Sequence, residues 1–156
     1  MILRLYHDGR SIAEIPGLKD SIEKAYSPFN LQVQDRGYLF LPDRSEDLNA
    51  ARLLKYLEAA SGGQVSLWLV QDTLTYPGIG QVFGCSAGRS AILSKSDLDP
   101  DSLIKEALHE VGHLMGLDHC VEHCVMSLSK SREEAGRKPY SFCPGCSALL
   151  RLKGNG

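Results

Sequence analysis

The order of apolar and polar positions along this 156-residue chain alternates between two patterns. Short apolar runs, some alternating with polar residues, are typical of β-strands, whereas apolar residues three or four positions apart are typical of one face of a helix. The strand-like runs cover residues 2–6, 31–41 and 65–70, and the helix-like segments cover 18–26, 48–60 and 99–115. This alternation predicts an α/β fold in which helices back a sheet.

Two of the predicted helices have recognisable starts. Ser45, followed by two acidic residues, is a reasonable start for the helix over 48–60, and Ser61-Gly62-Gly63 ends it. Asp99 and Pro100 are suited to the N-cap and first position of the helix that runs to Met115. The apolar face of the helix over 48–60 is expected to comprise Ala50, Leu53, Leu54 and Leu57.

The strand-like segments differ in expected position. Residues 65–70 are apolar on both faces, which predicts a central strand. The segment 31–41 is interrupted at Gly37, where we expect a turn or a bulge. Residues 73–91 are rich in Gly, Ser and Thr, so the strand candidates at 82–83 and 91–93 are expected at a sheet edge and the rim of a cleft.

The last third of the chain shows little regular pattern. Glycines and prolines at Gly136, Pro139, Pro144 and Gly145 keep it irregular, and it lacks the apolar residues for a large core of its own. The length favours one domain. We therefore expect a single domain over 1–156, with an α/β subdomain at 1–116 and a small C-terminal subdomain at 117–156.

Composition and charge exclude several classes of partner. Hydrophobic residues make up 43% of the chain, charged residues 23%, and the formal net charge is −2. This gives no electrostatic reason to expect nucleic acid or an anionic membrane as partner. Residues 1–6 are too short for a signal peptide, and no apolar run reaches the roughly 18 residues of a membrane helix. A cytoplasmic protein is expected, and its five cysteines argue against a disulfide framework.

Three histidines near the end of the last predicted helix have the spacing of metal ligands. His109 and His113 are four residues apart, so on a helix both side chains can reach one ion. Gly116 can end the helix in a left-handed conformation and so bring in His119 as a third ligand. Three imidazoles leave the fourth position of a tetrahedral zinc open. The pattern predicts a catalytic zinc site.

Glu110, beside the first histidine, is the predicted general base and acid. Zinc lowers the pKa of its bound water from about 16 to roughly 7, and a nearby carboxylate can pass the proton to a leaving amine. The HExxH spacing alone also arises by chance on helices whose histidines are merely solvated. Gly116 and His119 at their fixed offsets argue against coincidence, and a purely structural site has no use for Glu110.

Four of the cysteines, Cys120, Cys124, Cys143 and Cys146, lie beside the histidines in sequence. The Pro-Gly pair at 144–145 turns the chain so that the thiolates on either side point at one ion. Four thiolates form a closed set, typical of a structural zinc whose binding supplies folding free energy. The alternative is two unrelated reduced pairs. His119 and Cys120 are adjacent, and consecutive side chains of an extended segment point to opposite sides, so one segment can serve two ions.

Residues 109–119 resemble the extended signature of the metzincin clan of zinc metallopeptidases. That clan has a methionine in a tight turn beneath the metal, and Met126 is placed for this Met-turn, although it could be only a core methionine. Cysteines at 120, 124, 143 and 146 around Met126 are specifically similar to archaemetzincins, of prokaryotic or archaeal type. The match covers 109–146. Cys120 and Cys124 enclose three residues where animal members have four, which affects loop geometry rather than ligation.

The resemblance implies a twisted mixed sheet backed by helices, an active-site helix, and an edge strand at 81–86 that pairs with extended peptide. Together with the residues it predicts a zinc-dependent metallopeptidase in which Glu110 activates a zinc-bound water. We expect two zinc ions per chain, one catalytic and one structural, a peptide or protein substrate, and a monomer. The alternative is a zinc-stabilised module that binds peptide or protein with little or no turnover.

Other residues are chemically suggestive but carry weaker predictions. Cys85 is expected to be a small buried residue on or near a strand, and His7 and His123 are expected to be solvated. Tyr140 could stabilise an oxyanion, as a tyrosine does in some related families. Asp118 could support a metal-binding histidine, since such histidines usually donate their second ring N–H to an acceptor.

Overall fold

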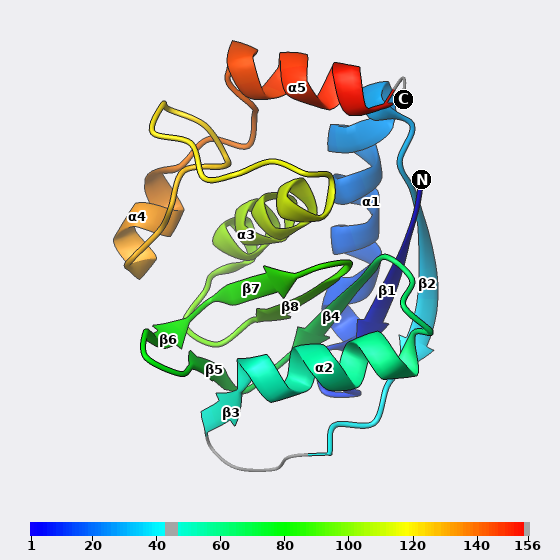
Figure 1. Cartoon of the computed structure of the whole chain (residues 1–156). Coiled ribbons are helices and arrows are strands. Elements are labelled where there is room, and N and C mark those ends of the chain that lie inside the picture. Colours follow the sequence, from blue (N-terminus) through cyan, green and yellow to red (C-terminus); the bar gives the residue numbers. More distant parts are fainter. Residues whose placement is uncertain (43–46, 155–156) are drawn as a thin grey trace.

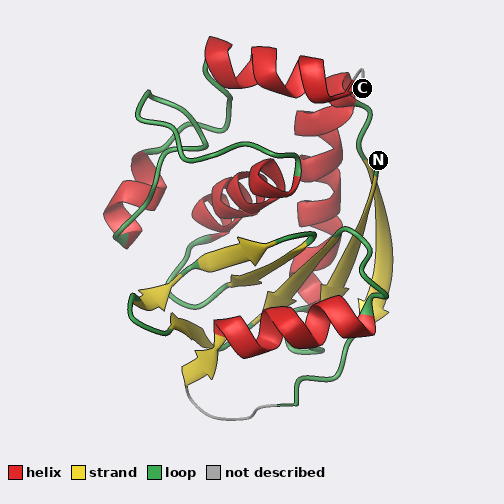
Figure 2. Cartoon of the chain, viewed as in Figure 1, coloured by secondary structure: helices red, strands yellow, loops and turns green. Residues whose placement is uncertain are grey.

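The computed structural model of the chain describes residues 1–42 and 47–154. It shows two sheets with helices on both sides (Figures 1 and 2). The larger sheet has the order β2-β1-β4-β8-β7. Its strands are β1 (Ile2–His7), β2 (Gln32–Tyr38), β4 (Ser66–Val70), β7 (Gly84–Ala87) and β8 (Ser90–Ser94). The smaller sheet has the order β3-β5-β6, from β3 (Asp47–Asn49), β5 (Thr73–Tyr76) and β6 (Gly80–Val82).

The middle of the larger sheet consists of parallel strands that are closed to solvent. All five residues of β4 are buried, and β4 pairs in parallel with β1 and β8, so the predicted central strand is confirmed. The expectation that Ala91–Leu93 lie at an edge is wrong. They belong to β8, an interior strand that pairs with β4 on one edge and with the antiparallel strand β7 on the other. Both of its faces are buried, because Ala91 and Leu93 belong to one apolar group and Ile92 to the other. The edge position belongs to β7.

Helices pack on the two faces of this sheet against two separate groups of apolar residues. Helices α1 (Ile15–Tyr26) and α3 (Pro100–Leu114) contact the face that carries Leu67 and Leu69 of β4. Helix α2 (Ala50–Ala60) covers the opposite face of the sheet (Figure 1). Trp68 and Val70 of β4 belong to the apolar group on that face. The alternation along β4 therefore assigns each side chain to one core. Short 3₁₀ turns at Ile12–Glu14 and Ser27–Phe29 flank α1.

The start of α2 differs from the sequence-based expectation. The predicted start at Ser45 lies outside the described residues. Asp47 and Leu48 belong to β3, and the N-cap is Asn49, whose side chain accepts a hydrogen bond from the Arg52 N–H at 3.1 Å. The predicted apolar face is confirmed: Ala50, Leu53, Leu54 and Leu57 are all buried. Gly37, with φ of 79°, lies directly after the register shift between β1 and β2, which confirms the bulge.

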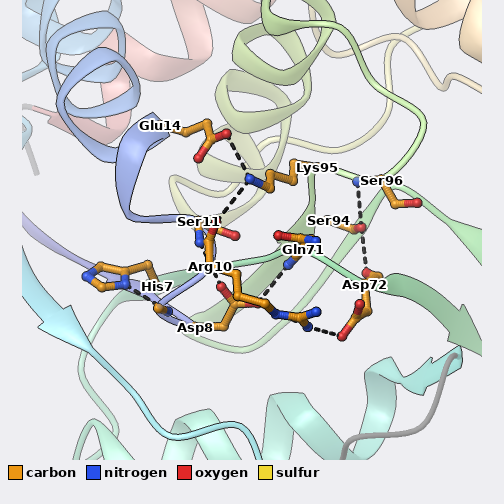
Figure 3. Close-up of polar contacts among 11 residues, drawn as sticks. His7, Asp8, Arg10, Ser11, Glu14, Gln71, Asp72, Ser94, Lys95 and Ser96 are labelled. Carbon is orange, nitrogen blue, oxygen red and sulfur yellow. Dashed lines mark hydrogen bonds and ion pairs between the residues drawn. The ribbon is translucent and has the colours of Figure 1, made fainter.

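The carboxyl ends of β1, β4 and β8 meet in a polar network (Figure 3). Asp8 accepts from the backbone N–H of Ser11 at 3.0 Å and of Gln71 at 2.8 Å. Arg10 pairs with Asp72, and Lys95 pairs with Glu14 at 2.9 Å. Open α/β sheets often bind ligands at the carboxyl ends of their strands. Here the charged side chains at that end form ion pairs and hydrogen bonds with one another. The histidines and cysteines predicted as metal ligands lie outside this network.

The C-terminal part is more regular than expected. It contains the short helix α4 (Arg132–Arg137) and the longer helix α5 (Pro144–Gly154). Phe142 contacts Tyr26 and Phe29 edge-on, with ring centroids 5.3 and 6.3 Å away, which ties this part to α1. Among the residues described, none of the helices has the length and hydropathy to cross a membrane.

Candidate metal centres

The helix α3 carries the predicted ligands into the interior. Asp99 caps it by accepting from the Ser102 N–H at 2.8 Å, and Pro100 takes the first position, as predicted. The helix ends at Leu114, one residue before the predicted end. A run of ten buried residues, with one break at Ile104, covers residues 102–112. A helix this buried holds its side chains rigidly, which suits a site that requires fixed geometry.

The structure brings His109, His113 and His119 together. One ring nitrogen from each lies within 4.8 Å of the others. The Nε2 atoms of His109 and His113 are 3.1 Å apart, and the ring of His119 lies 5.2 Å from that of His109 and 4.8 Å from that of His113. This separation is that of ligands around one ion, because two nitrogens each about 2 Å from a zinc lie roughly 3.3 Å apart in a tetrahedron.

Gly116 makes the turn that returns His119 to the helix. Its φ is 94°, a left-handed conformation that strains any residue with a side chain. The Gly116 N–H donates to the His113 carbonyl at 3.0 Å and the Leu117 N–H to the Gly112 carbonyl at 2.9 Å, which is a Schellman motif. An added Cβ at Gly116 would also lie 2.7 Å from Lys153 Nζ. The predicted left-handed turn at Gly116 is confirmed.

Main-chain carbonyls orient the two helix histidines. His109 Nδ1 lies 2.9 Å from the Val125 carbonyl oxygen, and His113 Nδ1 lies 2.8 Å from that of Leu117. With Nδ1–H donating to the carbonyl, each Nε2 keeps its lone pair for a metal. Carbonyls, rather than the suggested Asp118, thus support these two rings.

Burial favours the neutral form of two of the three imidazoles, those of His109 and His119. It lowers the pKa of His109 to about 3, with Lys138 and the other two histidines adding to the effect against the opposing Val125 hydrogen bond. Burial, followed by His113 and Lys138, also lowers the pKa of His119. Because a histidine must be neutral to bind a metal, these shifts prepare the cluster for ligation at neutral pH.

Glu110 directly follows His109 in the sequence, and its side chain is buried close to β7. Only 4% of it is exposed, and within the described part of the chain its Oε2 has no hydrogen-bond partner. Burial and, to a smaller extent, the charge of Glu106 raise the pKa of Glu110 to about 8 against the opposing effect of Lys138. A Cβ on Gly84 of β7 would lie 3.2 Å from Glu110 Oε1, so the absence of a side chain there leaves room for the carboxylate.

The four predicted cysteines also converge, with their sulfur atoms within 4.8 Å of one another. Cys124 Sγ accepts backbone N–H groups from Met126 at 3.4 Å and Cys143 at 3.3 Å, and Cys143 Sγ accepts from Cys146 at 3.5 Å. This last bond chiefly lowers the pKa of the Cys143 thiol, to about 7. N–H groups directed at sulfur favour thiolates, which is the form that binds zinc.

The two clusters share their backbone. His119 belongs to one and Cys120 to the other, as expected for consecutive side chains. A second connection was not predicted: Cys124 is followed directly by Val125, whose carbonyl oxygen orients His109. The Cys120 N–H donates to the Met126 carbonyl at 2.9 Å, which closes the loop between the clusters.

Met126 lies in a turn that packs against α3 at Gly112, between the two helix histidines. It is fully buried, and the Ser127 N–H donates to the Cys124 carbonyl at 3.0 Å across the turn. A Cβ on Gly112 would overlap Met126 Sδ, lie 2.9 Å from its Cε and lie 3.3 Å from the Tyr26 hydroxyl. The methionine therefore packs against the backbone of α3 at Gly112, where a side chain would collide with it.

Replacing Gly112 with alanine is expected to destabilise the protein by about 1–3 kcal/mol, because the new methyl group enters a filled space. This outweighs the gain of up to about 1 kcal/mol that alanine brings to a helix interior. Gly17 in α1 is the matched control, since an added Cβ meets nothing within 4 Å there. Chemical denaturation of the zinc-loaded proteins measures both. Equal stabilisation by the two substitutions would contradict the packing role of Gly112.

The remaining residues have varied outcomes. Cys85 lies on β7, partly buried, and burial followed by Glu110 raises the pKa of its thiol to about 12, against a reactive role. His123 is exposed as expected. His7 is 5% exposed, so the expectation of a surface position is wrong; its Nδ1 accepts from the Gly9 N–H.

Tyr140 contacts a lysine, because Lys105 Nζ lies over the Tyr140 ring at 4.9 Å from the ring centroid. No local pattern indicated the buried ion pair of Lys138 and Glu106, whose lysine Nζ lies 3.4 Å from His109 Nδ1.

Solved structures share this architecture. The chain aligns over its full length with 96% of the archaemetzincin from Methanopyrus kandleri, at 30% identity and a TM-score of 0.86. It aligns over 96% of its length with 99% of the archaemetzincin from Archaeoglobus fulgidus, solved in complex with malonate, at 28% identity and a TM-score of 0.83. The expected α/β fold is thus confirmed.

Sequence comparisons agree. Curated archaemetzincins from Archaeoglobus fulgidus and Aeropyrum pernix are 37% and 44% identical over 56% and 49% of this chain. The matched region spans 61% and 48% of those two relatives. An archaemetzincin from Pyrobaculum aerophilum is 37% identical over 62% of this chain and 68% of its own length. The model of peptidase family M54 matches residues 68–152, which include both clusters. The chain therefore belongs to peptidase family M54, in agreement with the predicted resemblance to archaemetzincins.

Proposed function

We propose that the chain is a zinc-dependent metallopeptidase that hydrolyses peptide bonds. One observation carries the proposal: Glu110 directly follows one of three converging histidines, is buried, and has an oxygen, Oε2, with no hydrogen-bond partner among the described residues. Family membership supports the same reaction class. A structural metal site needs ligands only, whereas a hydrolytic site also needs a base.

The donor sets fit two zinc ions per chain. His109, His113 and His119 would hold the catalytic ion with an open position, and the four cysteines would hold a structural ion in a closed set. Zinc, when bound to the histidines, supplies a Lewis acid that polarises a carbonyl and lowers the pKa of water. The sulfur-directed N–H groups and the carbonyl-bound Nδ1 atoms support this division.

Glu110 would move the proton. As a carboxylate it accepts a proton from the attacking water, and as a carboxylic acid it gives that proton to the leaving amine. Glu110 is buried from bulk water, and the lack of a side chain at Gly84 lets its carboxylate approach the β7 backbone. A base with its pKa near the working pH performs both transfers well, and the raised pKa of Glu110 is in that direction.

The edge strand β7 would bind the substrate. It pairs with β8 along one side and ends the sheet, so its other row of main-chain groups faces away from β8. An extended peptide can add to such an edge by main-chain hydrogen bonds. Because Gly84 of β7 lies against Glu110, a peptide paired there passes the proposed base. Peptides or proteins are therefore the proposed substrates.

A zinc-stabilised binding module is the competing function, and metal removal separates the two. Zinc-loaded protein is expected to cleave members of a mixed peptide library, to lose this activity after chelation, and to regain it on adding zinc. Mass spectrometry of the library detects the products. Peptides that are retained by the zinc-loaded protein but stay intact would contradict the peptidase and favour the binding module.

A further inference from the structure

A buried ion pair lies behind the histidine cluster, and the proposed mechanism does not use it. Lys138 Nζ is 3.0 Å from Glu106 Oε1, and the two side chains are only 2% and 5% exposed. Glu106 lies on α3 one turn before Glu110, and Lys138 directly follows α4. Burying two charges costs several kcal/mol per ion before their attraction offsets it. This cost raises the question of what the buried Glu106–Lys138 pair contributes to the neighbouring histidine cluster.

The ammonium group of Lys138 also touches a proposed metal ligand. Its Nζ lies 3.4 Å from His109 Nδ1. When His109 binds metal through Nε2, its Nδ1 carries a proton and donates to the Val125 carbonyl. Lys138 cannot then donate to that nitrogen. Two donors thus lie side by side, and each has its own acceptor: the Glu106 carboxylate for the lysine and a carbonyl for the histidine.

Without Lys138, Glu106 becomes a competitor for the His109 proton. The two residues are three positions apart on one helix, where side chains are neighbours. An ionised carboxylate is a stronger hydrogen-bond acceptor than a carbonyl. A buried Glu106 without its ammonium partner would draw the Nδ1–H away from Val125 and rotate the ring, so that Nε2 no longer points at the metal.

We propose that Lys138 is a positioning residue for the histidine metal site: by holding the Glu106 carboxylate, it leaves the His109 Nδ1–H to the Val125 carbonyl and keeps Nε2 directed at the ion. The inference rests on the proposed catalytic metal site. It concerns metal binding, so it can be tested without measuring activity.

A purely mechanical role for Lys138 can be separated from this one. Lys105 also joins α3 to α4, since its Nζ donates to the Gly136 carbonyl at 2.8 Å. Replacing Lys105 with methionine removes this link to α4 but leaves the Glu106–Lys138 ion pair in place. Lys105→Met is therefore the matched control for Lys138→Met. The double variant Glu106→Gln/Lys138→Met removes both charges as well as the link to α4.

The test measures zinc affinity of the histidine site by chelator competition, together with the visible spectrum of the cobalt-substituted protein. Lys138→Met is expected to lose about 10–100-fold in affinity and to change the spectrum of the histidine site, while the cysteine site keeps its metal. Lys105→Met is expected to bind as wild type does. The double variant is expected to recover most of the loss, because the competing carboxylate is gone.

Two results would overturn the proposal. Wild-type affinity and spectrum in Lys138→Met would remove the role altogether. A double variant as weak as Lys138→Met would make the lysine only an anchor for α4. If Lys138→Met does not fold, the double variant, which has no unpaired buried charge, is compared with the wild type instead. Weak zinc binding by the double variant would then overturn the proposal. Absence of metal at the histidine site of wild-type protein would instead contradict the proposed function, and this inference with it.

Discussion

Replacing Cys143 with serine is expected to release zinc from the cysteine site and also to weaken zinc binding by the histidines. The backbone explains the coupling. Cys124, a member of the cysteine cluster, directly precedes Val125, whose carbonyl orients His109. Cys120 directly follows His119. A loop that loses its structural ion thus moves the supports of two of the three histidines.

The expected loss is large. Structural zinc contributes about 10–16 kcal/mol in small zinc domains, which is comparable with the whole stability of a typical domain. We expect residues 117–154 to lose protection from hydrogen exchange in Cys143→Ser, and the histidine site to lose about 10–100-fold in zinc affinity. Elemental analysis and chelator competition measure the two sites. Cys85→Ser, outside the cluster, is the control. A variant that loses the structural zinc but keeps wild-type affinity at the histidines would contradict the coupling.

Replacing Glu110 with glutamine is expected to lower the rate of peptide hydrolysis by about 10²–10⁴-fold while both zinc ions stay bound. Glutamine has nearly the same shape but cannot accept the proton of the attacking water. The exposed Glu122 provides a matched control, and Glu122→Gln is expected to keep the wild-type rate. Hydrolysis by Glu110→Gln at the wild-type rate would contradict the role of this carboxylate.

The same substitution has a pH signature in the metal-free protein. The pKa of Glu110 is raised from 4.5 to about 8, chiefly by burial, so folding favours its protonated form. The stability that this provides is complete below the ordinary pKa and is lost as pH rises through the raised one. Glutamine stays neutral. Metal-free Glu110→Gln is therefore expected to melt above wild type at about pH 9 and together with it at about pH 4. Coincident melting at both pH values would show that the carboxylate is solvated.

Local patterns predicted the features that depend on neighbouring residues. The spacing of His109 and His113 on a helix, the left-handed Gly116 and the cap at Asp99 all follow from residues within one or two turns. The buried face of α2 does so as well. In each case the interactions that determine the structure are between residues of the same segment, so the local sequence is sufficient to predict it.

Features that depend on distant residues were missed or misplaced. The strand β8 became interior because β7 folds back along it, which no local pattern indicates. The helix α5 begins with Pro144 and Gly145, which interrupt most helices, although proline is favourable in a first turn. Lys138 and Glu106 are separated by 32 positions, so their pairing could not be read from either segment. These misses follow from tertiary contacts that override local preference.

We propose that two distinct metal centres share one segment of backbone. Elemental analysis after zinc loading and desalting counts the zinc ions per chain in purified wild-type protein and in His113→Ala. Two zinc ions are expected in the wild type and one in His113→Ala, which retains the four cysteines. The same count in both proteins would contradict a metal site at the histidines.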